Sequence, residues 1–133
     1  TELCAASILD MKWHELGPDT DWNSLDITAF ENEVCKEMGL IGEIIPRYRS
    51  TYFNHTFGGG YSAGYYGYLW AEVLDKDAFE YWQSNGLWNP EMARKFRSLF
   101  LEKGGSEEPM ILYHEFRGAD PDPDALVRAR GLE

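Results

Sequence analysis

Helix-breaking residues recur along the chain and divide it into short segments, most of which carry apolar residues at helical spacing. The breaks are Gly17-Pro18-Asp19, Gly39, Asn85-Gly86, Gly104-Gly105, Gly118 and Gly131. No run alternates for long in the manner of a strand. The sequence therefore predicts an all-α fold, an irregular bundle of about five or six helices joined by short loops.

Capping residues indicate where the individual helices begin. Residues 1–13 have the composition of a buried helix, and the predicted N-caps of later helices are Asp26, Ser62, Asn89 and Ser106. Ser62 would begin the longest helix, which runs to about Ser84. No composition shift marks a boundary inside the chain, so we expect a single subdomain over residues 1–133.

Composition excludes several classes of protein. The chain has 133 residues, of which 44% are hydrophobic and 15% aromatic, so it has enough apolar mass to fold. Its net charge of -11 argues against binding nucleic acid or an anionic membrane, although a small local basic patch remains compatible with it. No segment is long and apolar enough for a membrane span, and no signal-peptide pattern opens the chain. We expect a cytoplasmic protein, with a periplasmic or exported location as the alternative. Cys4 and Cys35 are too few for a disulfide framework and are expected to be buried thiols.

The segment from His55 to Tyr68 carries the strongest functional signal. If a helix begins near Tyr61, then Tyr61, Tyr65 and Tyr68 lie at i, i+4 and i+7 and share one stripe. Phenols stay neutral at pH 7 and donate hydrogen bonds to a peptide carbonyl or to a developing oxyanion. The pattern indicates a binding groove, while a tyrosine-rich helix packed in a core is the alternative.

Three consecutive glycines precede the tyrosines and add to this signal. Gly58, Gly59 and Gly60 would let the backbone approach a ligand closely and offer N–H groups, and His55 could add a side-chain donor. A phosphate cradle is a second interpretation of the glycines, but the segment lacks the lysine and the preceding strand of a P-loop. Arg47, upstream of the glycines, could hold a substrate carboxylate or pair with local acids, as could Arg49.

The chain offers no convincing metal site. His14-Glu15 begins like a zinc-peptidase motif, but the position four residues after His14 is Pro18 instead of a second histidine. The other two histidines are far from it in the sequence, and no other His/Cys group has metal-ligand spacing. We therefore expect no metal ligand in this chain.

At these residues the sequence resembles the thimet oligopeptidase and dipeptidyl carboxypeptidase family of zinc metallopeptidases. The matching segments are Leu9-Asp10-Met11, Trp13-His14, Arg47 to Phe53, His55 to Leu74, Phe96-Arg97, Gly104-Gly105-Ser106, Phe116-Arg117-Gly118, Pro121-Asp122-Pro123 and Arg130-Gly131-Leu132. The pattern His-x-x-Gly-Gly-Gly-Tyr is closer to the dipeptidyl carboxypeptidase branch. The resemblance implies that residues 1–133 are the C-terminal helical part of a longer enzyme and form one wall of its active-site channel.

The resemblance also implies roles for individual residues. It makes His55, Tyr61, Tyr65 and Tyr68 substrate-binding, with the glycine-rich loop beside them, and it gives the phenols, chiefly Tyr68, the task of stabilising the tetrahedral intermediate. Zinc and the general base would lie upstream of the region that this chain resembles. The implied partners are a peptide substrate and the upstream lobe of the same polypeptide.

Two other functions stay open at the level of sequence. The chain could be a stand-alone, non-catalytic helical module that binds peptide or protein through the tyrosine groove. It could also bind an anion or nucleotide at the glycine loop, which the charge of -11 disfavours. If the chain is a piece of a longer enzyme, we expect it to hydrolyse no peptide alone, to expose apolar surface and to self-associate.

Overall fold

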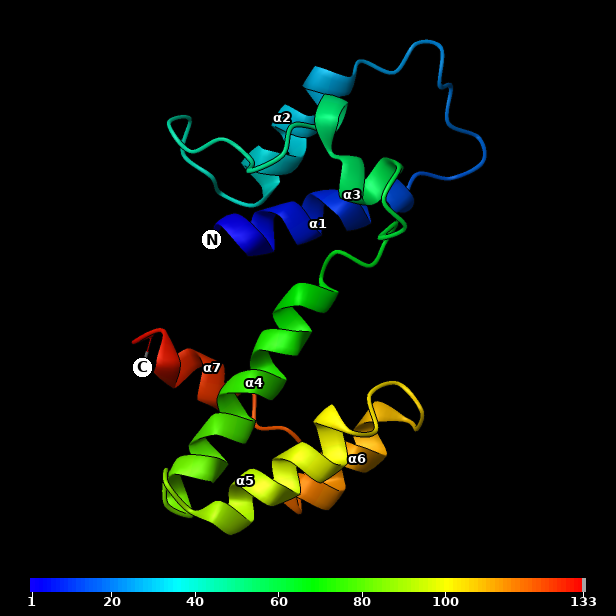
Figure 1. Ribbon diagram of the computed structural model, residues 1–133. Coiled ribbons are helices and arrows are strands. Elements are labelled where there is room, and N and C mark those ends of the chain that lie inside the picture. Colours follow the sequence, from blue (N-terminus) through cyan, green and yellow to red (C-terminus); the bar gives the residue numbers. More distant parts are fainter. Residues whose placement is uncertain (133) are drawn as a thin grey trace. The chain divides into compact units, whose positions relative to one another are not determined.

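The computed structural model describes residues 1–132, and every regular element within them is helical, which confirms the all-α prediction (Figure 1). The α-helices are α1 (Glu2–His14), α2 (Ile27–Glu37), α3 (Asn54–Phe57), α4 (Gly67–Ser84), α5 (Pro90–Phe96), α6 (Pro109–Arg117) and α7 (Asp124–Ala129). A 3-10 turn, η1 (Ser50–Tyr52), and a π-helical turn, η2 (Arg97–Leu101), complete the list. None of these helices is long and apolar enough to cross a membrane.

The chain forms two compact units, which we call unit 1 (Thr1–Leu69) and unit 2 (Trp70–Glu133). That the whole chain is one subdomain of a larger protein stays a prediction. The long helix α4 begins in unit 1 and supplies the first helix of unit 2. The candidate residues singled out by the glycine–tyrosine pattern all belong to unit 1.

Two small apolar clusters form the core of unit 1, and α1 contributes to both. Leu9 and Trp13 of α1 pack with Val34 of α2, and the partly buried Phe30 and Met38 cover this contact. The second cluster consists of Ala6, Phe53 and Tyr65, with Leu3 and Tyr48 packed against it. Because α1 buries residues toward both clusters, it lacks the single apolar stripe of a surface helix.

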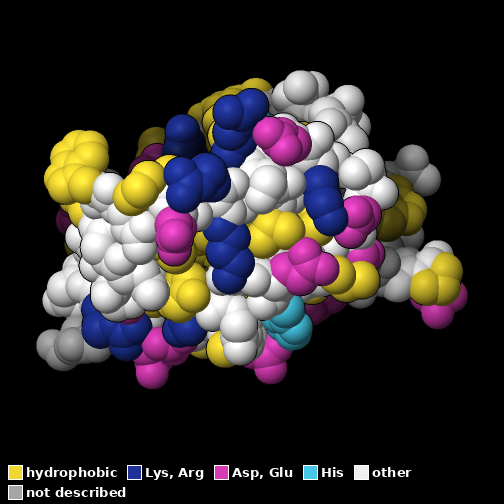
Figure 2. Space-filling model, turned by 60° about the horizontal axis from the view of Figure 1, so that its bottom comes forward, with side chains coloured by type: hydrophobic (Ala, Val, Ile, Leu, Met, Phe, Trp, Pro, Cys, Tyr) yellow, Lys and Arg dark blue, Asp and Glu magenta, His cyan; other side chains and the backbone are white. Residues whose placement is uncertain are grey.

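Unit 2 has a core built around Phe116 of α6, which is fully buried together with Leu112. Aromatic rings of α4, α5 and η2 surround Phe116 at centroid distances of 5.4–6.4 Å, namely those of Tyr81, Trp82, Phe96 and Phe100. Ion pairs tie α7 to α4, between Arg128 and Glu80 and between Arg130 and Glu72. In the face drawn in Figure 2, Lys and Arg side chains lie among exposed hydrophobic ones, so the acidic excess is not spread evenly.

Several predicted helix boundaries are confirmed. The Asp26 carboxylate accepts hydrogen bonds from the amides of Thr28 and Ala29, and Asn89 caps α5 through the amide of Glu91. Gly118 ends α6 in the left-handed conformation, with φ at +77°. These boundaries depend on residues that are close in sequence, which is why local patterns predict them.

Two predicted helix starts are wrong. The long helix begins at Gly67 rather than after Ser62, because residues 62–66 form turns whose amides bond to other partners. The later helix α6 begins at Pro109, with Glu108 instead of Ser106 at the N-cap position. Proline is favoured at the first helical position, because an N–H group there would have no partner inside the helix and proline has none. Cys4 and Cys35 lie in helices as expected but are half-buried, and burial raises the pKa of the Cys35 thiol.

Candidate functional site

A cluster of aromatic rings in unit 1 brings together the residues that the sequence singled out. We call it the tyrosine–histidine cluster; its members are Tyr48, Phe53, His55, Tyr61, Tyr65 and Tyr68. The His55 ring lies near three phenol rings, with centroid distances of 5.9 Å to Tyr61, 5.4 Å to Tyr65 and 6.2 Å to Tyr68. The four predicted side chains therefore face one another.

The three phenols share this place without sharing a helix. Only Tyr68 lies in α4, while Tyr61 and Tyr65 precede it in the turns. Tyr61 nonetheless stacks on Tyr68 at 5.5 Å, and Tyr65 meets Tyr68 edge-on at 5.1 Å. The prediction that one helical stripe brings the three phenols together is therefore wrong. The folded loop before α4 brings them together.

The three phenols differ in their access to solvent. Tyr61 is 44% exposed and Tyr68 is 41% exposed, whereas Tyr65 is only 3% exposed. The polar contact with the Tyr61 hydroxyl raises the pKa of the Tyr68 phenol, and burial raises the pKa of the Tyr65 phenol. Both phenols therefore stay protonated at neutral pH and can act as neutral donors.

The glycine run is required by the loop's own geometry. A Cβ on Gly58 would lie 2.7 Å from the Asn54 Oδ1 atom, and a Cβ on Gly59 would lie 3.0 Å from the His55 Cα atom. Gly60 has a φ of +82°, a conformation that side-chain-bearing residues rarely adopt. The loop folds back on α3 and orients the segment that leads to Tyr61.

Backbone groups of this loop are partly used within the chain. The Gly58 amide donates to the Asn54 carbonyl and the Tyr61 amide to the His55 carbonyl. Within residues 1–132, the amides of Gly59 and Gly60 have no hydrogen-bond partner. These two donors directly precede Tyr61 in the loop, where a ligand carbonyl could use them.

Tyr48 is a member of the cluster that sequence reasoning missed. Its ring stacks on Phe53 at 5.1 Å and lies 5.2 Å from His55. The Arg47 guanidinium carbon lies 5.6 Å from the centre of the same ring, and the neighbouring Tyr48 hydroxyl raises the pKa of Arg47. The sequence prediction of the site included the arginines on either side of this tyrosine but not the tyrosine itself.

Both arginines pair with local acids, and the Arg47 Nε atom lies 4.0 Å from the Glu2 carboxylate. Arg49 pairs with the buried carboxylate of Glu31, which also accepts hydrogen bonds from the Ser50 amide at 2.6 Å and the Ser50 hydroxyl at 2.9 Å. The Trp13 indole donates to the same hydroxyl at 2.9 Å. Of the two alternatives for Arg49, the structure shows pairing with a local acid.

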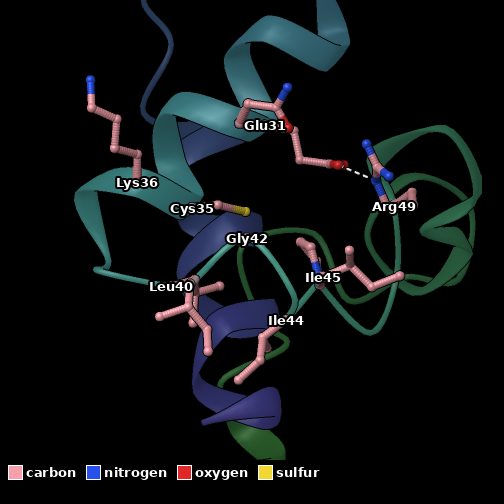
Figure 3. A pocket seen from close by; sticks show the side chains of 11 residues that line it. Glu31, Cys35, Lys36, Leu40, Gly42, Ile44, Ile45 and Arg49 are labelled. Carbon is pink, nitrogen blue, oxygen red and sulfur yellow. Dashed lines mark hydrogen bonds and ion pairs between the residues drawn. The ribbon is translucent and has the colours of Figure 1, made fainter.

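The pair of Glu31 and Arg49 also borders a pocket of about 180 Å³ between α2 and the connection that follows it (Figure 3). Apolar side chains of the connection from Leu40 to Ile45 line this pocket, together with Cys35. No member of the tyrosine–histidine cluster lines it. The pocket is thus separate from the candidate site.

Metal ligands do not gather within residues 1–132, where no group of three or more His, Cys, Asp or Glu side chains could hold an ion. His14 lies at the end of α1, and its Nδ1 atom is 2.7 Å from the Asp10 carbonyl. The residues present therefore do not fit a zinc ion, and the zinc that the family resemblance implies has no ligand set in this part of the chain.

The sequence of the chain matches the model of peptidase family M3 over residues 1–132. The chain belongs to this family. It is 39% identical over 134 residues to the dipeptidyl carboxypeptidase of Salmonella typhimurium, and 39% identical over 132 residues to that of Escherichia coli. Both matches include nearly all of this chain but only 19% of the relative. Oligopeptidase A of Haemophilus influenzae is 51% identical over 80 residues, which is 60% of this chain and 12% of the relative. The chain thus spans about a fifth of the dipeptidyl carboxypeptidases that it matches.

Proposed function

We propose that this chain is the substrate-binding part of a zinc-dependent peptidase that releases dipeptides from the C-terminus of short peptides. The clustering of His55, Tyr61, Tyr65 and Tyr68 around one point carries the proposal. The reaction class is taken from the relatives, since the similarity to dipeptidyl carboxypeptidases extends over the whole chain. The similarity to oligopeptidase A is higher in identity but is confined to 60% of the chain.

The exposed phenols supply the chemistry of this site. The side chains of Tyr61 and Tyr68 are 44% and 41% exposed, and each carries a phenolic hydroxyl that can donate to a peptide carbonyl or to the oxyanion formed from it. His55 adds a third side-chain donor, and the Gly59 and Gly60 amides can hold the peptide backbone. Tyr65 is buried and lies behind these groups, where it supports their positions.

Zinc and the general base would come from another part of a longer polypeptide, because the described residues offer no ligand set. The chain alone should therefore bind peptide and hydrolyse none, even with added zinc.

The other expected partner of the chain is the remainder of that longer polypeptide, which we place in the cytoplasm. Self-association of the isolated chain is expected from exposed apolar residues such as Ile41, Ile45 and Trp88. A surface charge of -11 disfavours nucleic acid as a ligand.

A chimera tests the catalytic part of the proposal. The matching fifth of the Escherichia coli dipeptidyl carboxypeptidase is replaced by this chain, and release of dipeptides is followed. Tyr68→Phe should lower turnover about 100- to 1,000-fold, the usual cost of removing one oxyanion donor. Tyr66→Phe is the control, since Tyr66 is exposed and lies outside the tyrosine–histidine cluster. Equal turnover in the two variants would show that Tyr68 has no such role.

Direct binding distinguishes the proposal from a stand-alone binding module. The chain is titrated calorimetrically with a short peptide that has a free C-terminus. Binding that is lost in Tyr61→Phe/Tyr68→Phe, together with an active chimera, supports the peptidase. Binding together with a folded but inactive chimera supports a non-catalytic module, and an absence of binding contradicts both.

A further inference from the structure

Asp10 of α1 holds a carboxylate that is completely buried although no cation from Lys or Arg pairs with it within the described residues. Its Oδ1 atom accepts a hydrogen bond from the Ala63 amide at 3.1 Å, and its Oδ2 atom accepts one from the Tyr65 amide at 3.0 Å. Burying a carboxylate is costly unless hydrogen bonds replace its hydration. The amides of Ala63 and Tyr65 replace the hydration of the Asp10 carboxylate, although both lie more than 50 residues from it in the sequence.

The two hydrogen bonds stabilise a backbone conformation that is unfavourable for the residue involved. Ala63, between the glycine loop and α4, has a φ of +52° and is the only non-glycine residue with positive φ within residues 1–132. An alanine in the left-handed region is disfavoured by contact between its Cβ atom and the backbone. A partner for its amide compensates for this strain, and Asp10 is that partner.

Tyr65 connects this backbone geometry to the candidate site. Its ring is the centre of the tyrosine–histidine cluster, at 5.0 Å from Phe53, 5.4 Å from His55, 5.1 Å from Tyr68 and 6.2 Å from Tyr48. Because the Tyr65 amide is fixed by Asp10, the position of this ring depends on the carboxylate. The rings of His55 and Tyr68 rest against it.

His14 completes the environment of the carboxylate. Its Nδ1 atom lies 3.2 Å from the Asp10 Oδ1 atom and 2.7 Å from the Asp10 carbonyl oxygen, one turn further along α1. Oδ1 thus faces both the Ala63 amide and the imidazole, whereas Oδ2 faces the Tyr65 amide alone. Each carboxylate oxygen of Asp10 therefore accepts from a different backbone amide. An asparagine side chain at this position has only one oxygen and could accept from only one of the two amides.

We infer that Asp10 is a positioning residue of the peptide-binding site, which sets the backbone at Ala63 and Tyr65 and so aligns the phenol and imidazole rings that face the substrate. The inference rests on the proposed function. The hydrogen bond from the Tyr65 amide to the Asp10 carboxylate, which is the structural part of this inference, can be measured without any ligand.

The first measurement uses the unaltered chain and requires no variant. Hydrogen-bond scalar couplings are recorded by NMR between the amide nitrogens of Ala63 and Tyr65 and the carboxylate carbon of Asp10. Observation of both couplings supports the link. Their absence, with other such couplings visible in the same sample, overturns it even if every Asp10 variant fails to fold.

The second measurement compares two buried aspartates. Asp10→Asn retains one acceptor oxygen and loses the other, so it should expose the Tyr65 or Ala63 amide to exchange and weaken peptide binding about tenfold. Asp77→Asn is the matched control, because Asp77 is equally buried but bonds to side chains of α6. It should leave the Tyr65 and Tyr68 ring signals and the peptide affinity unchanged. Equal losses of peptide affinity in both variants would contradict the positioning role and would mean that Asp10 only contributes to stability.

A rescue experiment separates positioning from stability. Ala63→Gly removes the steric cost of the left-handed conformation, so in the Asp10→Asn background it should restore most of the lost affinity. No restoration would contradict the positioning role. If the unaltered chain binds no peptide, the proposed function fails, and the Tyr65 and Tyr68 ring signals of these variants still decide whether Asp10 aligns the cluster.

Discussion

The two units of the chain each contain a cluster of aromatic rings, and the clusters differ in where their polar atoms lie. In unit 2 the rings of two phenylalanines, a tyrosine and a tryptophan surround the buried ring of Phe116. In unit 1 the rings are mostly tyrosines with a histidine, and the phenols of Tyr61 and Tyr68 are more than 40% exposed. The Phe116 ring has no polar atom to satisfy and lies at the centre of a core, whereas rings with exposed donors form a surface that can bind polar ligands.

Buried carboxylates show the same difference. Asp10 of unit 1 accepts hydrogen bonds from the backbone amides of Ala63 and Tyr65, in the turns before α4. Asp77 of unit 2 instead bonds to the side chains of Tyr113 and Arg117, both on α6. A carboxylate that holds a loop determines the shape of a site, while one that joins two helices contributes to stability.

The largest expected effect tests whether unit 2 depends on its aromatic core. Phe116→Ala should destabilise the unit by about 3–5 kcal/mol, because a fully buried ring leaves a cavity that its neighbours fill only partly. Phe79→Ala is the control, as Phe79 is exposed on α4 and should cost much less. Denaturant unfolding measures the change, and amide exchange assigns it to the unit. Similar losses for both variants would contradict a core centred on Phe116.

The next effect compares the hydroxyl groups of the two units. Tyr113→Phe should cost about 1.5–3 kcal/mol, since it removes a hydrogen bond to the buried carboxylate of Asp77. Tyr68→Phe should change stability by less than about 0.5 kcal/mol, because its side chain is 41% exposed and its hydroxyl contacts only the exposed Tyr61. Unfolding free energies of the two variants at pH 7 measure this difference. A large stability loss in Tyr68→Phe would mean that its hydroxyl serves the fold rather than a ligand.

The pH dependence sharpens the same comparison. Burial, with the hydrogen bond to Asp77 as second cause, raises the pKa of the Tyr113 phenol above its ordinary value. The stabilisation from this group is therefore complete below the unfolded-state pKa of about 10, and it declines as the pH rises toward the folded-state pKa. The stability advantage over Tyr113→Phe should be constant from pH 7 to about 9.5 and should shrink above about 10. A constant advantage up to pH 11 would argue against the bond to Asp77.

Features governed by neighbouring residues were predictable from the sequence. The caps at Asp26 and Asn89 and the stop at Gly118 involve bonds within a few residues, and each is confirmed. The start of α4 was not predictable in this way. Ser62 has the side chain of an N-cap, but the amides of Ala63 and Tyr65 bond to Asp10, and the Ser62 hydroxyl donates to the Thr56 carbonyl instead.

The candidate site shows the same limit. The sequence named the tyrosines and histidine that the structure brings together, but it attributed their proximity to helical spacing. Their proximity comes from a loop held by a distant carboxylate, and no local pattern contains that bond. Tyr48 was missed because its membership depends on stacking with Phe53 rather than on any motif. Such contacts between separate segments require coordinates.

The smallest predicted effect concerns Thr56 in α3, whose Oγ1 atom is the one buried side-chain polar atom without a hydrogen-bond partner among residues 1–132. Thr56 is fully buried next to His55, so its hydroxyl loses its hydration without compensation. Thr56→Val keeps the shape and removes this cost, and it should stabilise unit 1 by up to about 1 kcal/mol. Thr51→Val, at an exposed position in η1, should have almost no effect. Denaturant unfolding of both variants provides the comparison. A marked destabilisation by Thr56→Val would mean that the hydroxyl has a partner.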